Sequence, residues 1–459
     1  MTGVGRRPLL GAPFALALVS SPALAQDRRR GPPRDGAWTG AWAASAHGPY
    51  PSGNPSAQPD QSFAFPTPAE GARDQTMRMM VRPDIWGPAM RLRFSNAFGT
   101  RPLVIQGVHA GLQGVGGNVA RGTNRPVTFG GGRSVTIAPG ATAWSDAMEL
   151  PFMHGPGNPL LEGRRLAISF HVPGPTGPMT WHAKSLTTSY VTAPGAGDHA
   201  VEDSDAAFPY TTASWFFVDM VDMRAPTGTP VIVTFGDSIT DGTNSTMNGD
   251  DRWPDTLSRR LRARFGPRVS VVNAGIGGNR VAGPPDYTPA NPIPGGPSAL
   301  SRLDRDVLQV SGVRTVIWME GINDLGSAEA TADQVITGLR EGIRRLRERN
   351  IRVIGATLTT ALGYNGGHGT PQVDERRRAI NAWIRAPGNF DAVADFDAVT
   401  IDQATGQLKP AFIPNSTVGG AGDRLHPNRA GLMAMADSVP IDALGIAEPV
   451  APPPRPHRR

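Results

Sequence analysis

Hydrophobic and polar positions follow two different periods along the chain, and the change divides it into a strand-rich part and an α/β part. In the strand-rich part, residues 37–225, short apolar runs with alternating polar positions are separated by glycine and proline turns. A period of two is typical of β-strands, and many short strands at regular spacing predict an all-β sandwich of jelly-roll type. The clearest predicted strands are 91–95, 126–129, 134–137, 166–170 and 215–218.

The α/β part, residues 229–446, follows the turn-forming linker at 225–228 and alternates apolar strands with helical segments. The clearest helix is 331–349, where Thr331 and Gln334 stand at capping-box spacing. Alternation through five strands predicts a parallel sheet covered on both faces by helices. The predicted strands are 231–235, 269–273, 313–319, 352–357 and 392–396.

The two ends of the chain carry patterns that belong to neither part. Arg6 and Arg7 precede the apolar run 9–19 and a small-x-small cleavage pattern at 23–25, which predicts an export signal over residues 1–25. We therefore expect a secreted or periplasmic protein, with the twin-arginine and ordinary export routes both open. A disordered lead-in is expected at 26–36, and a proline-rich disordered tail at 447–459.

Charge and cysteine content exclude several classes of partner. The net charge is +6, but the positive residues are scattered among acids and only Lys184 and Lys409 are lysines, so we expect no nucleic-acid partner. The absence of cysteine excludes disulfides and thiolate metal sites. No run beyond the export signal is apolar enough to predict a transmembrane segment. The oligomeric state stays open.

A candidate nucleophile follows the first predicted strand of the α/β part. Gly236-Asp237-Ser238 comes directly after the apolar run, which places Ser238 at the C-terminal edge of the sheet, where ligands bind in open α/β sheets. A serine there needs a base, an orienting acid and oxyanion donors. Asp237 and Asp241 are expected to accept backbone N–H groups in the turn.

The candidate base and orienting acid lie together near the end of the α/β part. Asp423 stands three residues before His426, so its carboxylate can hold Nδ1 of the imidazole and leave Nε2 free for Ser238. Taken alone, this spacing also fits a capped helix start with a surface histidine. His368, in a loop after the fourth predicted strand, either lines the cleft or is a solvated loop residue.

Candidate oxyanion donors follow the second and third predicted strands. The glycine loop at 273–280 allows a backbone N–H to approach a ligand closely, and Asn323 can offer a side-chain N–H. Each feature alone also fits a tight turn or a helix cap. All of them follow strands of one sheet, in an order that brings them to one edge.

The four segments that carry these candidate residues resemble the four conserved sequence blocks of the SGNH hydrolases, the GDSL esterase/lipase family. The matching segments are 236–238, 273–278, 321–323 and 423–426. The resemblance implies a flavodoxin-like three-layer α/β/α fold and hydrolysis of carboxylic esters without a metal or cofactor. It implies Ser238 as nucleophile with Asp423 and His426 as the other triad members. The amides of Ser238 and Gly278 and the side chain of Asn323 would be the oxyanion donors. Segments 38–45 and 91–99 resemble the β-rich N-terminal domain of secreted bacterial members.

The expected function is hydrolysis of acetyl or other small acyl esters on an extracellular carbohydrate, through an acyl-enzyme. The alternatives are a lipase or general short-chain carboxylesterase and, more remotely, a non-catalytic carbohydrate-binding protein. Tryptophans of the strand-rich part would form either a sugar-stacking platform or part of the sandwich core. They are Trp38, Trp42, Trp144, Trp181 and Trp215.

Overall fold

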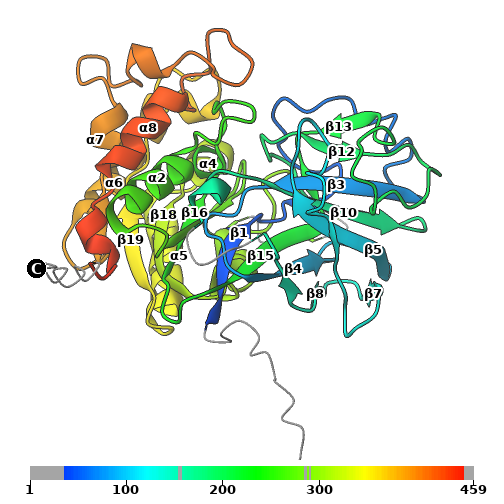
Figure 1. Ribbon diagram of the computed structural model, residues 1–459. Coiled ribbons are helices and arrows are strands. Elements are labelled where there is room, and N and C mark those ends of the chain that lie inside the picture. Colours follow the sequence, from blue (N-terminus) through cyan, green and yellow to red (C-terminus); the bar gives the residue numbers. More distant parts are fainter. Residues whose placement is uncertain (1–35, 153–157, 284–286, 289–290, 449–459) are drawn as a thin grey trace, which may run out of the picture. The chain divides into compact units, whose positions relative to one another are not determined.

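The computed structural model describes residues 36–152, 158–283, 287–288 and 291–448 (Figure 1). From Gly36 onward the chain forms one compact unit. The predicted export signal lies outside the described residues, as do nearly all of the lead-in and most of the proline-rich tail.

The strand-rich part consists of antiparallel sheets. One sheet has the order β1-β15-β4-β8 with β9 beside β4, a second has the order β13-β12-β3-β10-β5-β6 with β7 beside β5, and a third has the order β14-β11-β2. The predicted β-sandwich is therefore present. The strands are β1 Ala37–Ala43, β2 Gly48–Pro49, β3 Gln75–Val81, β4 Ala89–Ser95, β5 Leu103–Leu112, β6 Arg125–Pro126, β7 Ser134–Ile137, β8 Thr142–Trp144, β9 Met148–Glu149, β10 Leu166–Val172, β11 Thr180–His182, β12 Ser189–Val191, β13 Tyr210–Thr212, β14 Trp215–Phe216 and β15 Val218–Ala225.

Aromatic and aliphatic side chains of these sheets form one core. Trp42, Trp181 and Trp215 are buried in it, with 7%, 2% and 5% of their surface exposed. The indole N–H of Trp181 donates to the carbonyl of Ser52, and that of Trp215 to Met80. These three tryptophans therefore belong to the core and offer no face for stacking on a sugar.

Two of the predicted strands differ from the observed ones. The predicted strand at 215–218 is divided into β14 and β15 because Phe217 has a φ of 59°, which no extended strand allows. The predicted strand at 126–129 shortens to β6, and Phe129 forms only an isolated bridge to Gly132.

The α/β part is built on one parallel sheet with the order β17-β16-β18-β19-β20 (Figure 1). All five strands coincide closely with predicted ones, and the chain changes from antiparallel to parallel pairing between Ala225 and Val231. The strand β16 lies between β17 and β18, so the loops that follow these three strands are neighbours at one edge. The strands are β16 Val231–Gly236, β17 Ser270–Gly275, β18 Val313–Met319, β19 Arg352–Ala356 and β20 Ala392–Ala394.

Helices flank the parallel sheet in two packed groups. The helices α2 and α7 both pack on α8, whereas α3 and α6 both pack on α5. The predicted capping box of α5 is present, with Thr331 and Gln334 each accepting a backbone N–H of the other. The three-layer prediction is confirmed. The helices are α1 Ser238–Asp241, α2 Trp253–Phe265, α3 Ala299–Leu303, α4 Ile322–Ser327, α5 Ala332–Arg347, α6 Pro371–Arg385, α7 Phe396–Thr400 and α8 Arg429–Ser438. Short helical turns lie at Pro159–Leu161, Asp304–Leu308, Gly367–Gly369, Pro410–Phe412 and Ile441–Leu444.

The first strand of the strand-rich part packs directly on the parallel sheet. Gly40 of β1 donates its N–H to the carbonyl of Ser311 and accepts the hydroxyl of Ser270, which begins β17. Within the compact unit the two parts thus share backbone contacts. Their predicted division into separate domains, 37–225 and 229–446, stays a prediction.

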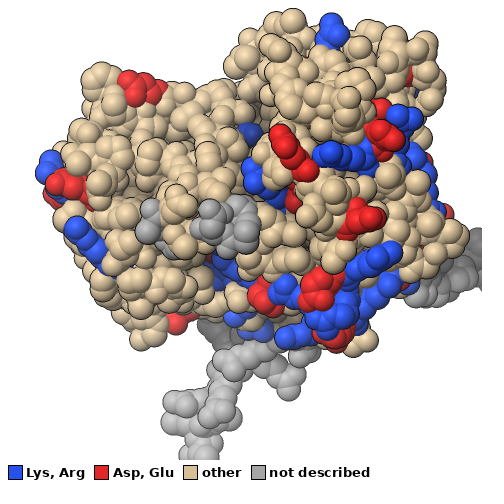
Figure 2. All heavy atoms as spheres, turned by 180° about the vertical axis from the view of Figure 1, so that it is seen from behind, with Lys and Arg blue, Asp and Glu red and all other residues tan. Residues whose placement is uncertain are grey.

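On the face drawn in Figure 2, acidic and basic side chains lie next to one another and do not form separate patches of one charge. Of the residues that the structure describes, no helix is long and apolar enough to cross a membrane.

Candidate active site

Ser238 lies at the C-terminal end of β16, in the turn that begins α1. Asp237 caps this short helix, and its Oδ1 accepts the N–H of Ile239 at 3.0 Å, the structural role expected for it. Burial raises the pKa of Asp237 to about 7, so this carboxyl is a poor candidate for a charged partner of the serine. The turn leaves Ser238 with 7% of its surface exposed.

A hydrogen-bonded chain connects Ser238, His426 and Asp423. The Oγ of Ser238 is 2.8 Å from Nε2 of His426, and Nδ1 of the same ring is 2.5 Å from Oδ2 of Asp423. With Asp423 accepting from Nδ1–H, Nε2 is the ring nitrogen that can take the serine proton. The backbone carbonyl of His426 accepts the side-chain amide of Asn244, which fixes the loop beside the nucleophile turn.

The Asp423 carboxylate is held in its charged form. Burial alone would raise its pKa, but the hydrogen bond and charge of His426 and two backbone N–H groups lower it to about 2. Those N–H groups belong to Leu425 and His426, and both donate to Oδ1 at 2.9 Å. The side chain of Asp423 is 36% exposed and that of His426 is 14% exposed, so solvent reaches the acid more than the base.

The glycine loop after β17 forms a tight turn beside the nucleophile. The N–H of Asn279 donates to the carbonyl of Ile276 at 3.1 Å, and Gly278 has a φ of +82°. A side chain is strained at that φ, and a Cβ on Gly278 would stand 2.5 Å from Nδ2 of Asn54. Only glycine fits this position without rearrangement.

Asn323 lies in the first turn of α4 and connects two loops of the sheet edge. Its Nδ2 donates to the carbonyl of Asn279 at 3.0 Å, and its Oδ1 is 3.1 Å from Nε2 of His368. Asp324 accepts the N–H of Val281. His368 is half-buried and contacts Asn323, so it is not a fully solvated loop residue.

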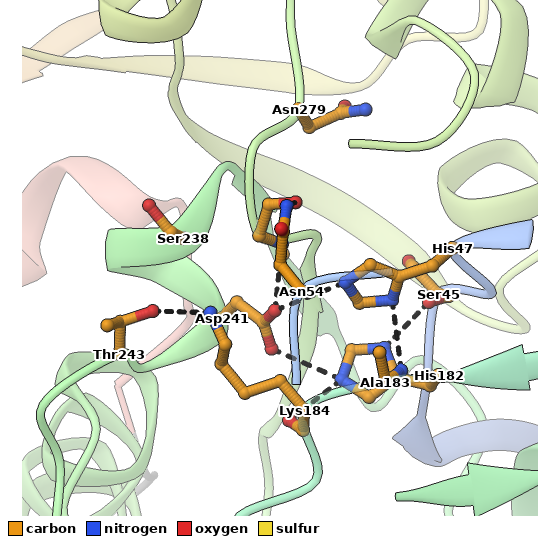
Figure 3. Close-up of polar contacts among 12 residues, drawn as sticks. Ser45, His47, Asn54, His182, Ala183, Lys184, Ser238, Asp241, Thr243 and Asn279 are labelled. Carbon is orange, nitrogen blue, oxygen red and sulfur yellow. Dashed lines mark hydrogen bonds and ion pairs between the residues drawn. The ribbon is translucent and has the colours of Figure 1, made fainter. Parts of the chain in front are cut away.

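A polar cluster joins three side chains of the strand-rich part to Asp241, which ends the turn that carries Ser238 (Figure 3). The cluster consists of His47, His182, Lys184 and Asp241, and all four side chains are buried. Nε2 of His182 is 3.1 Å from Oδ1 of Asp241, and Nζ of Lys184 donates to the hydroxyl of Thr243 at 2.5 Å. The turn that carries Ser238 is therefore anchored in the strand-rich part.

The polar cluster keeps the carboxylate of Asp241 ionised. Burial would raise its pKa, but His182, Lys184 and His47 together lower it to about 2. Both ring nitrogens of His182 face oxygen acceptors, because Nδ1 is 2.7 Å from the carbonyl of Ser45. His182 thus connects the carboxylate of Asp241 to the backbone of the strand-rich part.

The arrangement has the parts that acyl transfer through a serine requires. A nucleophile, a base and an orienting acid are in hydrogen-bond contact, and a glycine turn and an asparagine lie on the neighbouring strand ends. Among the described residues, no three His, Cys, Asp or Glu side chains are grouped so that they could hold a metal ion.

The sequence indicated Ser238, Gly278, Asn323, Asp423 and His426 as site residues. The structure places the first three just after β16, β17 and β18, and hydrogen bonds connect His426 and Asp423 to Ser238. It did not indicate the polar cluster. His47 and His182 carried no distinguishing pattern among the histidines of the strand-rich part, and only the scarcity of lysine set Lys184 apart.

Comparison with protein families gives one match. The profile described as the GDSL-like lipase/acylhydrolase family covers residues 234–433. A comparison with curated proteins found no match.

Solved structures similar to this chain cover somewhat less than half of it. A carbohydrate acetylesterase family member from Sinorhizobium meliloti is 16% identical, with 47% of this chain and 100% of that chain covered and a TM-score of 0.35. A GDSL-like lipase from Bacteroides thetaiotaomicron is 15% identical, with coverages of 47% and 88% and a TM-score of 0.34. A lipolytic G-D-S-L family protein from Veillonella parvula is 20% identical, with coverages of 46% and 95% and a TM-score of 0.33.

Proposed function

Residues 234–433 belong to the GDSL-like lipase/acylhydrolase family, which makes the protein a carboxylic ester hydrolase, and on this basis we propose that it works through an acyl-enzyme on Ser238. The observation that carries the proposal is the continuous chain from Ser238 through His426 to Asp423, with contacts of 2.8 and 2.5 Å. The alternative of a non-catalytic carbohydrate-binding protein is set aside.

In the proposed mechanism, Oγ of Ser238 attacks the ester carbonyl while its proton moves to Nε2 of His426. Collapse of the tetrahedral intermediate breaks the bond to the alcohol, which leaves with that proton. A water molecule then gives a proton to His426 and attacks the acyl carbon, and the acid leaves as Ser238 recovers its proton. Asp423 holds the ring in the required tautomer and stabilises its positive charge.

Negative charge develops on the carbonyl oxygen in both halves of this reaction. We assign its stabilisation to the N–H groups of Ser238 and Gly278 and to the side-chain amide of Asn323. Donors fixed before the reaction begins are usually the largest single contribution to such catalysis. The glycine turn and the hydrogen bonds of Asn323 support the assignment, because they hold these donors in place.

Replacement of the nucleophile tests the mechanism. Ser238→Ala should lower kcat on p-nitrophenyl acetate by on the order of a million-fold, the effect of losing the serine in a serine hydrolase. Ser301→Ala is the control, because Ser301 is an exposed serine on α3 whose hydroxyl contacts Ser298. A Ser238→Ala protein that retained its turnover would contradict the mechanism.

The proposed substrates are acetyl or other small acyl esters on an extracellular carbohydrate. The export signal expected at residues 1–25 supports this proposal, because an exported esterase meets extracellular glycans. We accordingly propose a secreted or periplasmic location. The test is Ser238-dependent release of acetate from acetylated xylan, pectin or peptidoglycan.

A lipase or general short-chain carboxylesterase is the second candidate. It is favoured by the burial of Trp42, Trp181 and Trp215, which removes these side chains as a sugar-stacking platform. Turnover confined to p-nitrophenyl esters, without acetate release from any glycan, would select this candidate. The dependence of kcat/KM on acyl length would then separate a lipase from a short-chain esterase.

A further inference from the structure

The turn that offers the Gly278 N–H contains a peptide group with two accessible orientations. In the turn Ile276–Asn279, a positive φ at the third residue is the mark of a type II turn. The central peptide of this turn joins the carbonyl of Gly277 to the N–H of Gly278. In the related type I turn the same peptide is rotated by about 180°.

Two glycines at the centre of the turn make that rotation easy. Neither residue has a Cβ to favour one orientation, so the local backbone alone does not decide where the Gly278 N–H points. A rotated peptide would direct this N–H away from the position that it has in the structure. A contact from outside the loop is needed to select one orientation.

Asn54, in the segment of the strand-rich part between β2 and β3, makes such a contact. Its Nδ2 donates to the carbonyl of Gly277 at 2.7 Å, across 223 positions of sequence. The half-buried side chain lies close to both glycines, since added Cβ atoms on Gly277 and Gly278 would stand 3.2 and 2.5 Å from its Cβ and Nδ2.

The N–H of Gly277 is held by the polar cluster. The N–H of Gly277 donates to Oδ2 of Asp241 at 2.8 Å, and the opposite oxygen of that carboxylate contacts His182. Gly277 is thus fixed at its N–H by the nucleophile turn and at its carbonyl by Asn54. The carbonyl contact is the one that decides the orientation of the peptide carrying the Gly278 N–H.

We propose that Asn54 is a positioning residue for the oxyanion site, so that the strand-rich part completes the active site of the α/β part. The inference rests on the proposed function, because it takes the Gly278 N–H as an oxyanion donor. A hydrogen bond donated to the Gly277 carbonyl also polarises the peptide and strengthens its N–H as a donor. Asn54 therefore both orients and strengthens this donor.

Asn54→Ala tests the proposal in the full chain. We expect kcat on p-nitrophenyl acetate to fall about 10-fold, less than the roughly 100- to 1000-fold cost of losing a donor outright. KM should stay unchanged, because the lost interaction acts in the transition state. Gln58→Ala is the matched control: Gln58 is a half-buried amide of the same segment that bonds Thr212 and Ala213 within the strand-rich part.

A transition-state analogue separates positioning from a general structural effect. A trifluoromethyl ketone adds to the serine and forms an oxyanion, so its inhibition constant should rise by the same factor by which kcat falls. Asn54→Asp keeps the shape but removes the donor and sets an acceptor against the Gly277 carbonyl. We expect it to lower kcat more than Asn54→Ala does.

Three outcomes would overturn the proposal: an Asn54→Ala kcat within twofold of wild type, an equal loss in Gln58→Ala, or an unchanged inhibition constant for the ketone. Failure of the proposed function has a different signature, because Ser238→Ala would then keep its turnover. A wild-type rate in Asn54→Ala beside an inactive Ser238→Ala would reject only the role of Asn54.

Discussion

The two sides of Ser238 are built in different ways. On one side, Asp423 and His426 lie three residues apart on a single loop, and the side chain of Asp423 is partly exposed. On the other side, the peptide 277–278 is held by side chains from distant segments, including Asn54 from the strand-rich part. The pair of Asp423 and His426 is local in sequence, whereas the peptide 277–278 is held by contacts between distant segments.

The two sides also differ in how deeply their carboxylates are buried. Asp423 and Asp241 both have a pKa lowered to about 2, but Asp423 is partly exposed and Asp241 is buried against His182. Because solvent screens the partly exposed Asp423, its substitution should change stability less than substitution of the buried Asp241. Substitution on the oxyanion side should affect both the chemistry and the stability.

The largest effect expected from this comparison is at Asp423. Asp423→Asn should lower kcat by roughly 10,000-fold, as in serine proteases whose triad aspartate is replaced, because the imidazole loses its required tautomer. The melting temperature should stay close to that of wild type. Asp437→Asn, at an exposed carboxylate of α8, is the control for kinetics and stability. A loss below about 10-fold would mean that Asp423 is not the orienting acid.

A smaller effect is expected at the side-chain donor of the oxyanion site. Asn323→Ala should lower kcat by roughly 100- to 1000-fold with little change in KM, since the amide acts on charge that develops in the transition state. Asn389→Ala, which removes an amide that bonds the carbonyl of Trp383, serves as control. Steady-state kinetics in which KM rose and kcat stayed constant would reassign Asn323 to substrate binding.

The smallest expected effect is on stability and concerns the buried carboxylate of Asp241. The folded pKa of Asp241, about 2, lies below the ordinary value of 3.8, so its charge stabilises the fold above about pH 4. This contribution is lost as pH falls through the folded pKa. The shift corresponds to about 2 kcal/mol. The unfolding free energies of wild type and Asp241→Asn, measured in urea, should therefore converge between about pH 4 and pH 2. A gap that did not change with pH would contradict an ionised Asp241 in the folded protein.

The sequence predicts the parallel sheet well because its strands are buried on both faces. Such strands are continuous apolar runs, and 313–319 coincides with β18 at both ends. The strand β3 shows why the strand-rich part was predicted less completely. Its seven residues are all buried, including Arg78, whose guanidinium bonds backbone carbonyls and Ser169, so the sequence shows no alternation.

The strand break at Phe217 escaped prediction for a related reason. A positive φ is normally signalled by glycine, asparagine or aspartate, and a phenylalanine gives no such signal. The surrounding core, in which Phe217 is 2% exposed, holds the residue in this conformation. Tertiary packing outweighs local preference at this position.

The residues of the candidate site also differ in whether a local sequence pattern indicates them. Ser238 and the pair Asp423 and His426 are indicated by short motifs whose spacing carries the chemistry. The contact of Asn54 with Gly277 joins residues too far apart in sequence for any local pattern to reveal. Sequence thus predicts the chemical groups, and only the fold reveals what holds them.

The most direct test of the central claim is covalent labelling with a fluorophosphonate, followed by peptide mass spectrometry. Such a reagent adds irreversibly to a serine activated by its base, so it reports the nucleophile whatever the natural substrate is. We predict a single label on the peptide containing Ser238, and none in Ser238→Ala. A label on another residue, or equal labelling of Ser238→Ala, would contradict the assignment of Ser238 as the nucleophile.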